Sequence, residues 1–158
     1  MKTIVAIFAL LVPASLFAPY ADKKPHFCHK YDYCDEIVHL SIRYGIEPEY
    51  TLALILHESI SPVGYYKLSN KKYLRGKSGE YCPAQVMPYN FPKHLKESDY
   101  YKPQVCISAS LTYLSKCYRR FGNYREALLC YNKGPNRKNW RPKYAEAIIK
   151  NYWRLKNE

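Results

Sequence analysis

Apolar residues recur along this chain at the three- and four-residue spacing of amphipathic helices. The pattern predicts a first pair of helices from about 32 to 44 and from 48 to 58, because Gly45 can end one helix and Pro48 can open the next. Three more helices are expected, from about 104 to 121, 125 to 132 and 142 to 155. The spacing therefore predicts a mainly α-helical domain.

The residues expected to face the core or to lie on the apolar side of these helices are Ile37, Val38, Leu40, Ile42, Leu52, Ile55, Ile107, Leu111, Leu114, Tyr118, Tyr144, Ile148, Ile149 and Trp153. The break between the third and fourth helices falls at Gly122 and Asn123, and Asn123 can cap the fourth. Residues 61–103 are rich in Tyr, Lys, Gly and Pro, which indicates loops with a small hairpin. We expect this irregular segment to form the wall of a binding site.

Glu58 is a lone acid at the end of the apolar helix in the sequence YGIEPEYTLALILHES. Burial penalises the charged form of a carboxyl, so the pKa of Glu58 is expected to rise. A carboxyl that stays protonated near neutral pH can donate a proton to a leaving oxygen. His57 precedes it but points about 100° away around the helix and is not expected to be its partner. A solvated acid on an amphipathic helix is the alternative that this segment leaves open.

The N-terminus, MKTIVAIFALLVPASLFA, has a Lys, an apolar stretch and small residues near Ala18. This layout predicts a secretory signal peptide over residues 1–18, with an uncleaved anchor as the alternative. Residues 19–158 then form a single domain. Without residues 1–18 the formal net charge falls from +12 to +11, which favours an anionic partner such as a cell-wall polymer, a membrane surface or nucleic acid.

Cysteines occur at an even number of positions after the export signal, which predicts disulfides formed in an oxidising compartment. Their spacing fits no zinc template well, and the sequence does not choose among the pairings. The candidates are Cys28, Cys34, Cys82, Cys106, Cys117 and Cys130. We therefore expect an exported protein located in the periplasm or outside the cell.

Three short segments stand out in order along the chain: the helix ending in Glu58 and Ser59, then SGEYCPAQVMP at 78–88, then ALLCYNKGP at 127–135. Together with KYAEAIIKNYWRL at 143–155, they resemble the soluble-type lytic transglycosylases and their small periplasmic or phage relatives. Those enzymes are lysozyme-like and cut peptidoglycan. The resemblance implies a lysozyme-like fold with a helical core and a long loop or small hairpin.

The resemblance also implies roles for individual residues. Glu58 is the catalytic acid, and Ser59, Gln85, Tyr131 and Asn132 support it or contact the sugar. The implied reaction cleaves the β-1,4 bond between N-acetylmuramic acid and N-acetylglucosamine and forms a 1,6-anhydro ring, without a cofactor or a metal. The implied partner is the peptidoglycan glycan strand, bound by a monomer with no nucleic acid.

The second segment departs from the family pattern, because Cys82, Pro83 and Ala84 stand where the family has Gly, Leu and Met. This departure puts sugar contacts there in doubt and leaves open a non-catalytic, disulfide-stapled glycan-binding protein. Glu80 is a candidate second acid, which leaves open a lysozyme-type hydrolase that finishes with water. Tyr65, Tyr66, Tyr73 and Tyr89 are candidate platforms for sugar rings. Association with a larger envelope or virion assembly is compatible with the same sequence.

Overall fold

The computed structural model describes residues 25–31, 33–59 and 75–158. Within them, five α-helices form the domain: α2 (Cys34–Tyr44), α3 (Pro48–Glu58), α5 (Pro103–Phe121), α6 (Tyr124–Lys133) and α7 (Pro142–Lys156). Short 3-10 helices join or precede them: η2 (His26–Lys30), η4 (Pro88–Asn90), η5 (Glu97–Tyr101) and η6 (Arg137–Asn139). The prediction of a mainly helical domain is confirmed. The predicted signal peptide lies outside the described residues.

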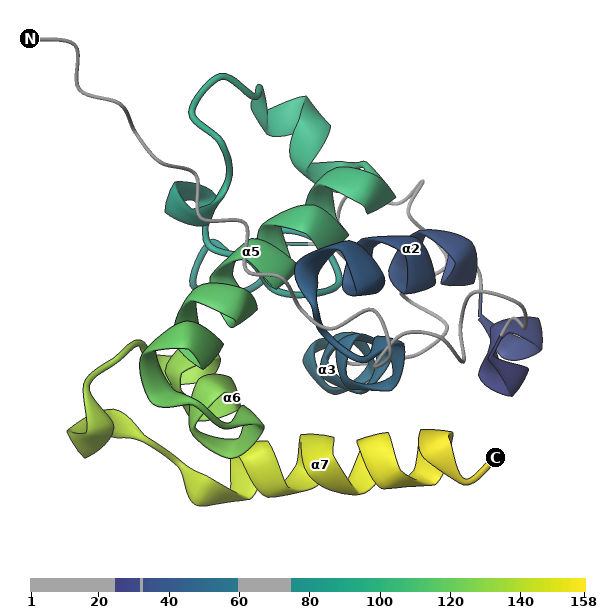
Figure 1. The fold of residues 1–158 in the computed structure, drawn as a ribbon. Helices are drawn as coiled ribbons and strands as arrows, with labels where there is room; N and C mark the ends of the chain where they lie inside the picture. The colour runs from purple at the N-terminus through teal and green to yellow at the C-terminus, as the bar shows by residue number, and fades with distance from the viewer. Residues whose placement is uncertain (1–24, 32, 60–74) are drawn as a thin grey trace, which may run out of the picture.

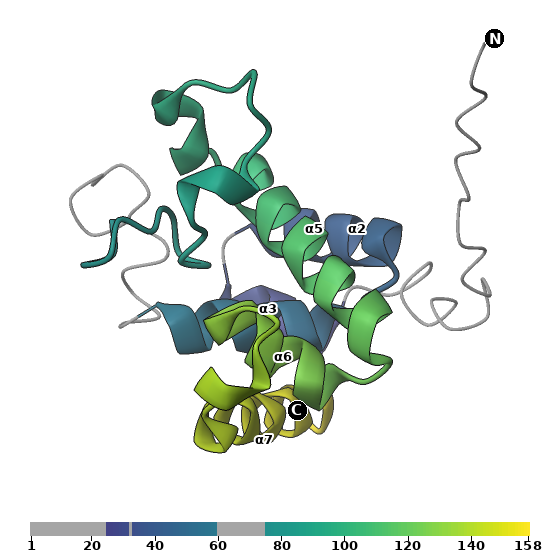
Figure 2. The same cartoon turned by 90° about the vertical axis from the view of Figure 1, so that its left-hand side faces the viewer.

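Helix α5 is the longest element and crosses the middle of the molecule (Figure 1). It packs against α2 on one side and α6 on the other, while α7 packs against α3 and α6. Figure 2 shows α7 and the segment around η4 and η5 at opposite ends of this helical core. A buried hydrogen bond from Ser41 to Thr51, 2.7 Å long, joins α2 to α3. The two buried hydroxyls therefore form a hydrogen bond with each other where α2 packs against α3.

The ends of the helices follow from proline and glycine. The first turns of three helices contain Pro48, Pro103 and Pro142. A proline costs no hydrogen bond there, because an N–H in the first turn has no partner within the helix. Gly45 and Gly122 end α2 and α5 with left-handed backbone, φ 69° and 76°, which suits a residue without a Cβ. These local signals explain why the predicted helix boundaries match the observed ones closely.

The expected small hairpin is present only as two isolated bridges, Arg75 with Tyr81 and Tyr81 with Val86. Tyr81 and Val86 exchange both backbone hydrogen bonds at 2.8 Å. Between them, Cys82 and Gln85 have positive φ values of 58° and 50°, so the chain turns too tightly to extend a strand. The segment is a compact turn that lies against the helices.

The core faces of three helices differ from the prediction. Tyr118 is 37% exposed and Trp153 is 54% exposed, whereas Cys117 and Tyr152 are buried in their place. On α5 the buried stripe steps by three residues from Leu114 to Cys117, which leaves Tyr118 at the edge. In α2 the spacing also missed Ser41, which is fully buried while its apolar neighbours are only partly so.

Disulfides join Cys28 to Cys34, Cys82 to Cys106 and Cys117 to Cys130. The expectation of paired cysteines is confirmed, and the pairing is the information that the sequence lacked. Two of the bonds fasten α5, one to the turn before Gln85 and one to α6. No helix in the described part of the chain is both long and apolar enough to cross a membrane.

Candidate active site

Glu58 lies at the C-terminal end of α3, where the helix opens into a cleft of about 390 Å³. The other walls come from the turn at 80–90, from α5 and from the end of α6. The lining residues are Glu58, Glu80, Gln85, Val86, Met87, Tyr89, Asn90, Tyr113, Tyr131, Asn132, Lys133 and Gly134. The cleft therefore brings together residues from all three segments that stood out in the sequence.

The Glu58 carboxyl is half-buried, and its environment acts on it in two directions. Burial, helped by the charge of nearby Glu80, raises the pKa of Glu58 from 4.5 to about 7. The hydrogen bond from Tyr144 and the charge of Lys133 act to lower that pKa, but burial is the stronger influence. Near neutral pH both the acid and the carboxylate are therefore populated.

Tyr144 on α7 is the direct partner of this carboxyl, since its Oη donates a hydrogen bond to Oε1 of Glu58. The ring of His57 packs edge-on against the Tyr144 ring, with 4.9 Å between centroids. Burial lowers the pKa of His57, so the imidazole favours its neutral form. The sequence had placed Tyr144 only among apolar helix positions. No local signal singled out Tyr144, because Tyr152 and Trp153 are further aromatic residues of the same helix.

Tyr131 is buried, and its hydroxyl donates a 2.8 Å hydrogen bond to the carbonyl oxygen of Ala84. Burial, together with the charge of Glu58, raises the pKa of Tyr131 well above its ordinary value. The phenol therefore fastens the altered 82–84 segment to α6 and presents its oxygen only as an acceptor. Asn132, the next residue, lines the cleft and is half-buried.

Ser59 does not line the cleft. Its hydroxyl donates to the carbonyl oxygen of Pro83 at 3.1 Å, so it holds the end of α3 against the same turn that Tyr131 fastens. This geometry explains how the segment with Cys82, Pro83 and Ala84 keeps its place. The disulfide to Cys106 adds a third attachment.

Gln85 and Glu80 lie side by side on the cleft wall. The Gln85 side chain donates to the carbonyl oxygen of Cys82 at 3.1 Å, and Glu80 accepts a 3.0 Å hydrogen bond from the Ser78 backbone N–H. A Cβ added at Gly76 would meet Glu80 at 2.2 Å and Gln85 at 2.4 Å, so both side chains rest against this glycine. The direction of Glu80, which the sequence left open, is thus into the cleft wall.

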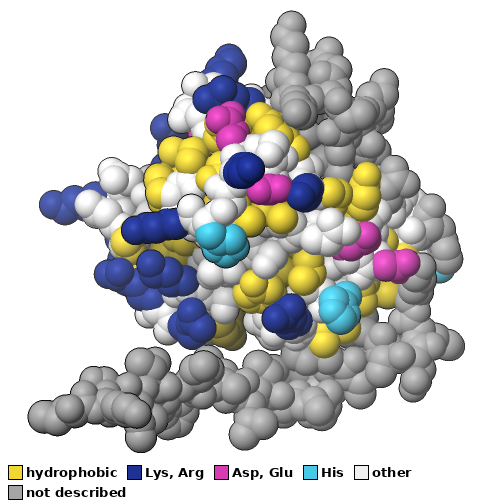
Figure 3. Space-filling model, turned by 90° about the horizontal axis from the view of Figure 1, so that it is seen from above, with side chains coloured by type: hydrophobic (Ala, Val, Ile, Leu, Met, Phe, Trp, Pro, Cys, Tyr) yellow, Lys and Arg dark blue, Asp and Glu magenta, His cyan; other side chains and the backbone are white. Residues whose placement is uncertain are grey.

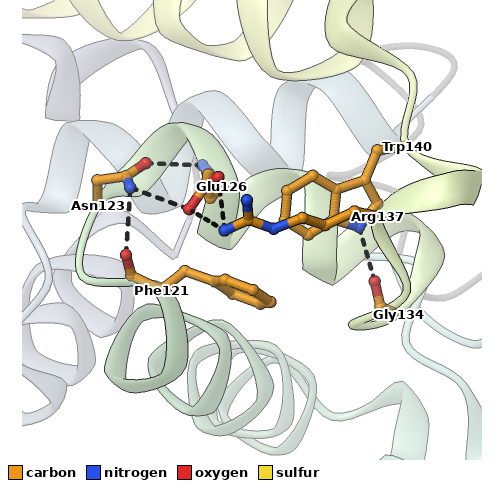
Figure 4. A network of polar contacts seen from close by, with 6 residues as sticks. All are labelled: Phe121, Asn123, Glu126, Gly134, Arg137 and Trp140. Atoms are coloured by element: carbon orange, nitrogen blue, oxygen red, sulfur yellow. Dashed lines mark hydrogen bonds and ion pairs between the residues drawn. The ribbon is translucent and has the colours of Figure 1, made fainter.

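The rim beyond α6 is held by the polar network in Figure 4. Arg137 forms an ion pair with Glu126 at 3.0 Å, and its guanidinium lies over the rings of Phe121 and Trp140, at 5.6 and 5.4 Å. The indole of Trp140 donates to the carbonyl oxygen of Gly134 at 2.9 Å. Because Gly134 lines the cleft, this clamp fixes the rim of the site.

Tyr89 is 75% exposed at the cleft, an arrangement that suits a platform for a sugar ring. The other tyrosines considered for this role, Tyr65, Tyr66 and Tyr73, lie outside the described residues. In the described part of the chain, no group of three or more His, Cys, Asp or Glu side chains is placed to hold a metal ion. The described cleft offers acid–base chemistry, and the carboxyl whose pKa lies near neutrality is Glu58.

The mainly helical domain, with Glu58 at the end of a core helix and facing a cleft, is of the lysozyme-like class. The chain matches the transglycosylase SLT domain family over residues 37–153, and it belongs to that family. A comparison with curated proteins finds no match.

A solved structure with the same fold is that of lytic transglycosylase Slt from Pseudomonas aeruginosa, in an inactive mutant that carries Gln in place of a Glu. It shares 18% sequence identity with this chain, and the two superpose with a TM-score of 0.62. The match covers 91% of this chain but only 26% of the other. The likeness therefore concerns the fold of one domain within a much longer protein.

Proposed function

We propose that this protein is a peptidoglycan lytic transglycosylase that uses Glu58 as its general acid and then its general base. The observation that carries the proposal is the position of this carboxyl, which is half-buried in a cleft with a pKa of about 7. Membership of the SLT family supports peptidoglycan as the substrate. A pKa near the working pH suits a group that must both give and take a proton.

In the first half of the proposed reaction, protonated Glu58 donates its proton to the oxygen between N-acetylmuramic acid and N-acetylglucosamine. The bond from C1 of the muramic acid to that oxygen breaks, and positive charge develops on the muramic acid ring. The N-acetyl group of the substrate can stabilise this charge, so a second protein carboxylate is not required. Burial of Glu58 supports this half, because it keeps the acid protonated.

In the second half, the Glu58 carboxylate takes the proton from the C6 hydroxyl of the same muramic acid. The C6 oxygen then bonds to C1 and closes the 1,6-anhydro ring, and Glu58 is returned to its acid form. Tyr144 supports this half, because its hydrogen bond favours the carboxylate and holds Oε1 in one direction. A nucleophile held within the substrate can be worth several kcal/mol over free water, and this advantage favours the anhydro product.

A lysozyme-type hydrolysis is the second candidate, and the position of Glu80 supports it. Glu80 lines the same cleft and raises the pKa of Glu58 by its charge. In that reaction Glu80 would activate a water molecule, and the released fragments would carry the mass of that water. The anhydro reaction is preferred because its nucleophile, the C6 hydroxyl, is already held within the bound substrate.

The test is digestion of purified peptidoglycan followed by mass spectrometry of the released fragments, for the wild type, Glu58→Gln, Glu80→Gln and Glu146→Gln. Glu146 is an exposed carboxyl on α7, outside the cleft, and serves as the matched control. We expect fragments lighter by one water from the wild type, Glu80→Gln and Glu146→Gln. Glu58→Gln should lose at least about 10² to 10⁴ in rate.

Fragments with the full mass of water, together with an inactive Glu80→Gln, would assign hydrolysis instead. No fragments from the wild type, with binding to peptidoglycan retained, would identify a glycan-binding protein.

We further propose that the protein acts outside the cytoplasm, and the three disulfides support this location. Association with an envelope or virion assembly stays a prediction.

A further inference from the structure

A second hollow of about 450 Å³ adjoins the cleft, and we call it the basic annex. It shares Tyr89, Asn90, Tyr113 and Gly134 with the cleft, so the two hollows lie next to each other. Beyond these shared residues, the annex is lined by Lys116, Cys117, Arg120, Cys130 and Pro135. A ligand that fills the cleft can therefore continue into the annex.

The annex differs from the cleft in charge. Glu58, Glu80 and Lys133 line the cleft, whereas the charged side chains among the described residues lining the annex are both basic, Lys116 and Arg120. Both cations are exposed, and no ion pair with another described residue occupies either of them. Figure 3 shows Lys and Arg side chains over much of the face seen from above, most closely grouped at its left edge. The annex therefore offers positive charge to a ligand.

The two cations share one face of a fixed helix. Tyr113, Lys116 and Arg120 follow one another on α5 at steps of three and four residues, which align side chains along a helix. At a rise of about 1.5 Å per residue, Arg120 lies about 10 Å along the axis from Tyr113 in the shared wall. The Cys117–Cys130 disulfide joins α5 to α6 in the same wall, so its shape is held covalently.

We propose that the basic annex binds the carboxylates of the peptide that peptidoglycan carries on its muramic acid. The inference rests on the proposed function, since a glycan strand in the cleft would present this peptide beside the cleaved bond. The peptide carries free carboxylates several bonds away from the sugar, and Lys116 and Arg120 are exposed cations in the hollow that adjoins the cleft. The annex thus makes the site selective for glycan with its peptides attached over glycan without them.

The experiment measures binding rather than cutting, so that it remains informative if the protein does not cleave glycan. Glu58→Gln protein is titrated with glycan oligomers that carry intact peptides and with the same oligomers after an amidase has removed them. We expect about threefold to tenfold tighter binding of the peptide-bearing oligomers, as two partly exposed ion pairs would give. When Lys116→Gln and Arg120→Gln are introduced into the Glu58→Gln protein, the ratio of its affinities for the two oligomers should fall to nearly one.

The matched control adds Arg119→Gln and Lys150→Gln, which remove the same charge from exposed positions outside the annex. The control variant should show the same ratio of affinities as the Glu58→Gln protein. Converting the peptide carboxyls of the ligand to methylamides should remove its advantage over the peptide-free oligomer. Equal binding of the two oligomers, or an equal loss of the ratio in the control, would overturn the proposal. Tighter binding of a poly(glycerol phosphate) chain than of the peptide-bearing oligomers would overturn it in favour of a phosphate polymer.

Discussion

Replacing Glu58 by Gln should stabilise the protein above neutral pH relative to the wild type. The folded state raises the pKa of this carboxyl from 4.5 to about 7, because burial penalises the charge. Between these two values the folded protein binds the proton more tightly than the unfolded chain does. The unfolding free energy of the wild type therefore falls as the pH rises through this window, and that of the Gln variant does not share the fall.

The size of the effect follows from the pKa values. Each pH unit of difference corresponds to about 1.4 kcal/mol, so a rise from 4.5 to about 7 corresponds to about 3 kcal/mol. The difference in unfolding free energy between Glu58→Gln and the wild type should move by about this amount, in favour of Gln, from pH 4 to pH 8. It should be constant outside the window, where both states of the wild type carry the same number of protons at this site.

Urea unfolding of both proteins at a series of pH values, with the disulfides intact, measures this difference. The midpoint and slope give the unfolding free energy of each protein at each pH. Glu146→Gln, which removes an exposed carboxyl on α7, is measured in parallel as the control. A difference that does not change with pH would refute the argument. A change of opposite sign would show that the Tyr144 hydrogen bond outweighs burial at this carboxyl.

Three further variants test the supports of the site. Tyr144→Phe removes a hydrogen bond that favours the Glu58 carboxylate, so the alkaline limb of kcat/KM should move up by about one pH unit and kcat should fall; an unmoved limb in the pH–rate profile would count against this role. Replacing Cys82 and Cys106 by Ser opens a bond between residues 24 apart, and calorimetry should show a loss of about 3 kcal/mol; unchanged stability would contradict it. Arg137→Ala breaks the clamp on the rim and should raise KM more than it lowers kcat, with a stability loss of about 1 kcal/mol; a loss in kcat alone would exclude a role in shaping the rim.

The helices of this protein were predictable because their ends carry local signals. Pro48 opens α3 and Gly122 ends α5 through the backbone preferences of single residues, which need no knowledge of the rest of the fold. The core face of α5 was less certain. Cys117 and Tyr118 both fit an apolar stripe, and only the position of α6 decides that the smaller residue is buried.

The candidate site was predictable only in part. Glu58 and the Tyr131–Asn132 pair could be found from short segments in a recognisable order, and the structure brings them to one cleft. Tyr144 could not be assigned, because its contact with Glu58 spans 86 residues and depends on how α7 packs against α3. The pairing of Cys82 with Cys106 could not be predicted either, because it joins residues 24 apart in the sequence. This disulfide helps to hold the altered segment at Cys82, Pro83 and Ala84 in place.

The proposed reaction, which uses Glu58 as both acid and base, depends on a balance in the environment of this carboxyl. With a pKa of 4.5, only about 0.3% of Glu58 would be protonated at pH 7, and donation to the leaving oxygen would be rare. Burial raises the pKa of Glu58 to about 7, so that about half of the molecules hold the proton. Without the hydrogen bond from Tyr144, burial would raise the pKa of Glu58 further. Fewer molecules would then hold the carboxylate that, in the proposed reaction, removes a proton from the C6 hydroxyl. The hydrogen bond and the charges that act on this pKa come from Tyr144, Glu80 and Lys133, so none of them comes from the altered positions Cys82, Pro83 and Ala84.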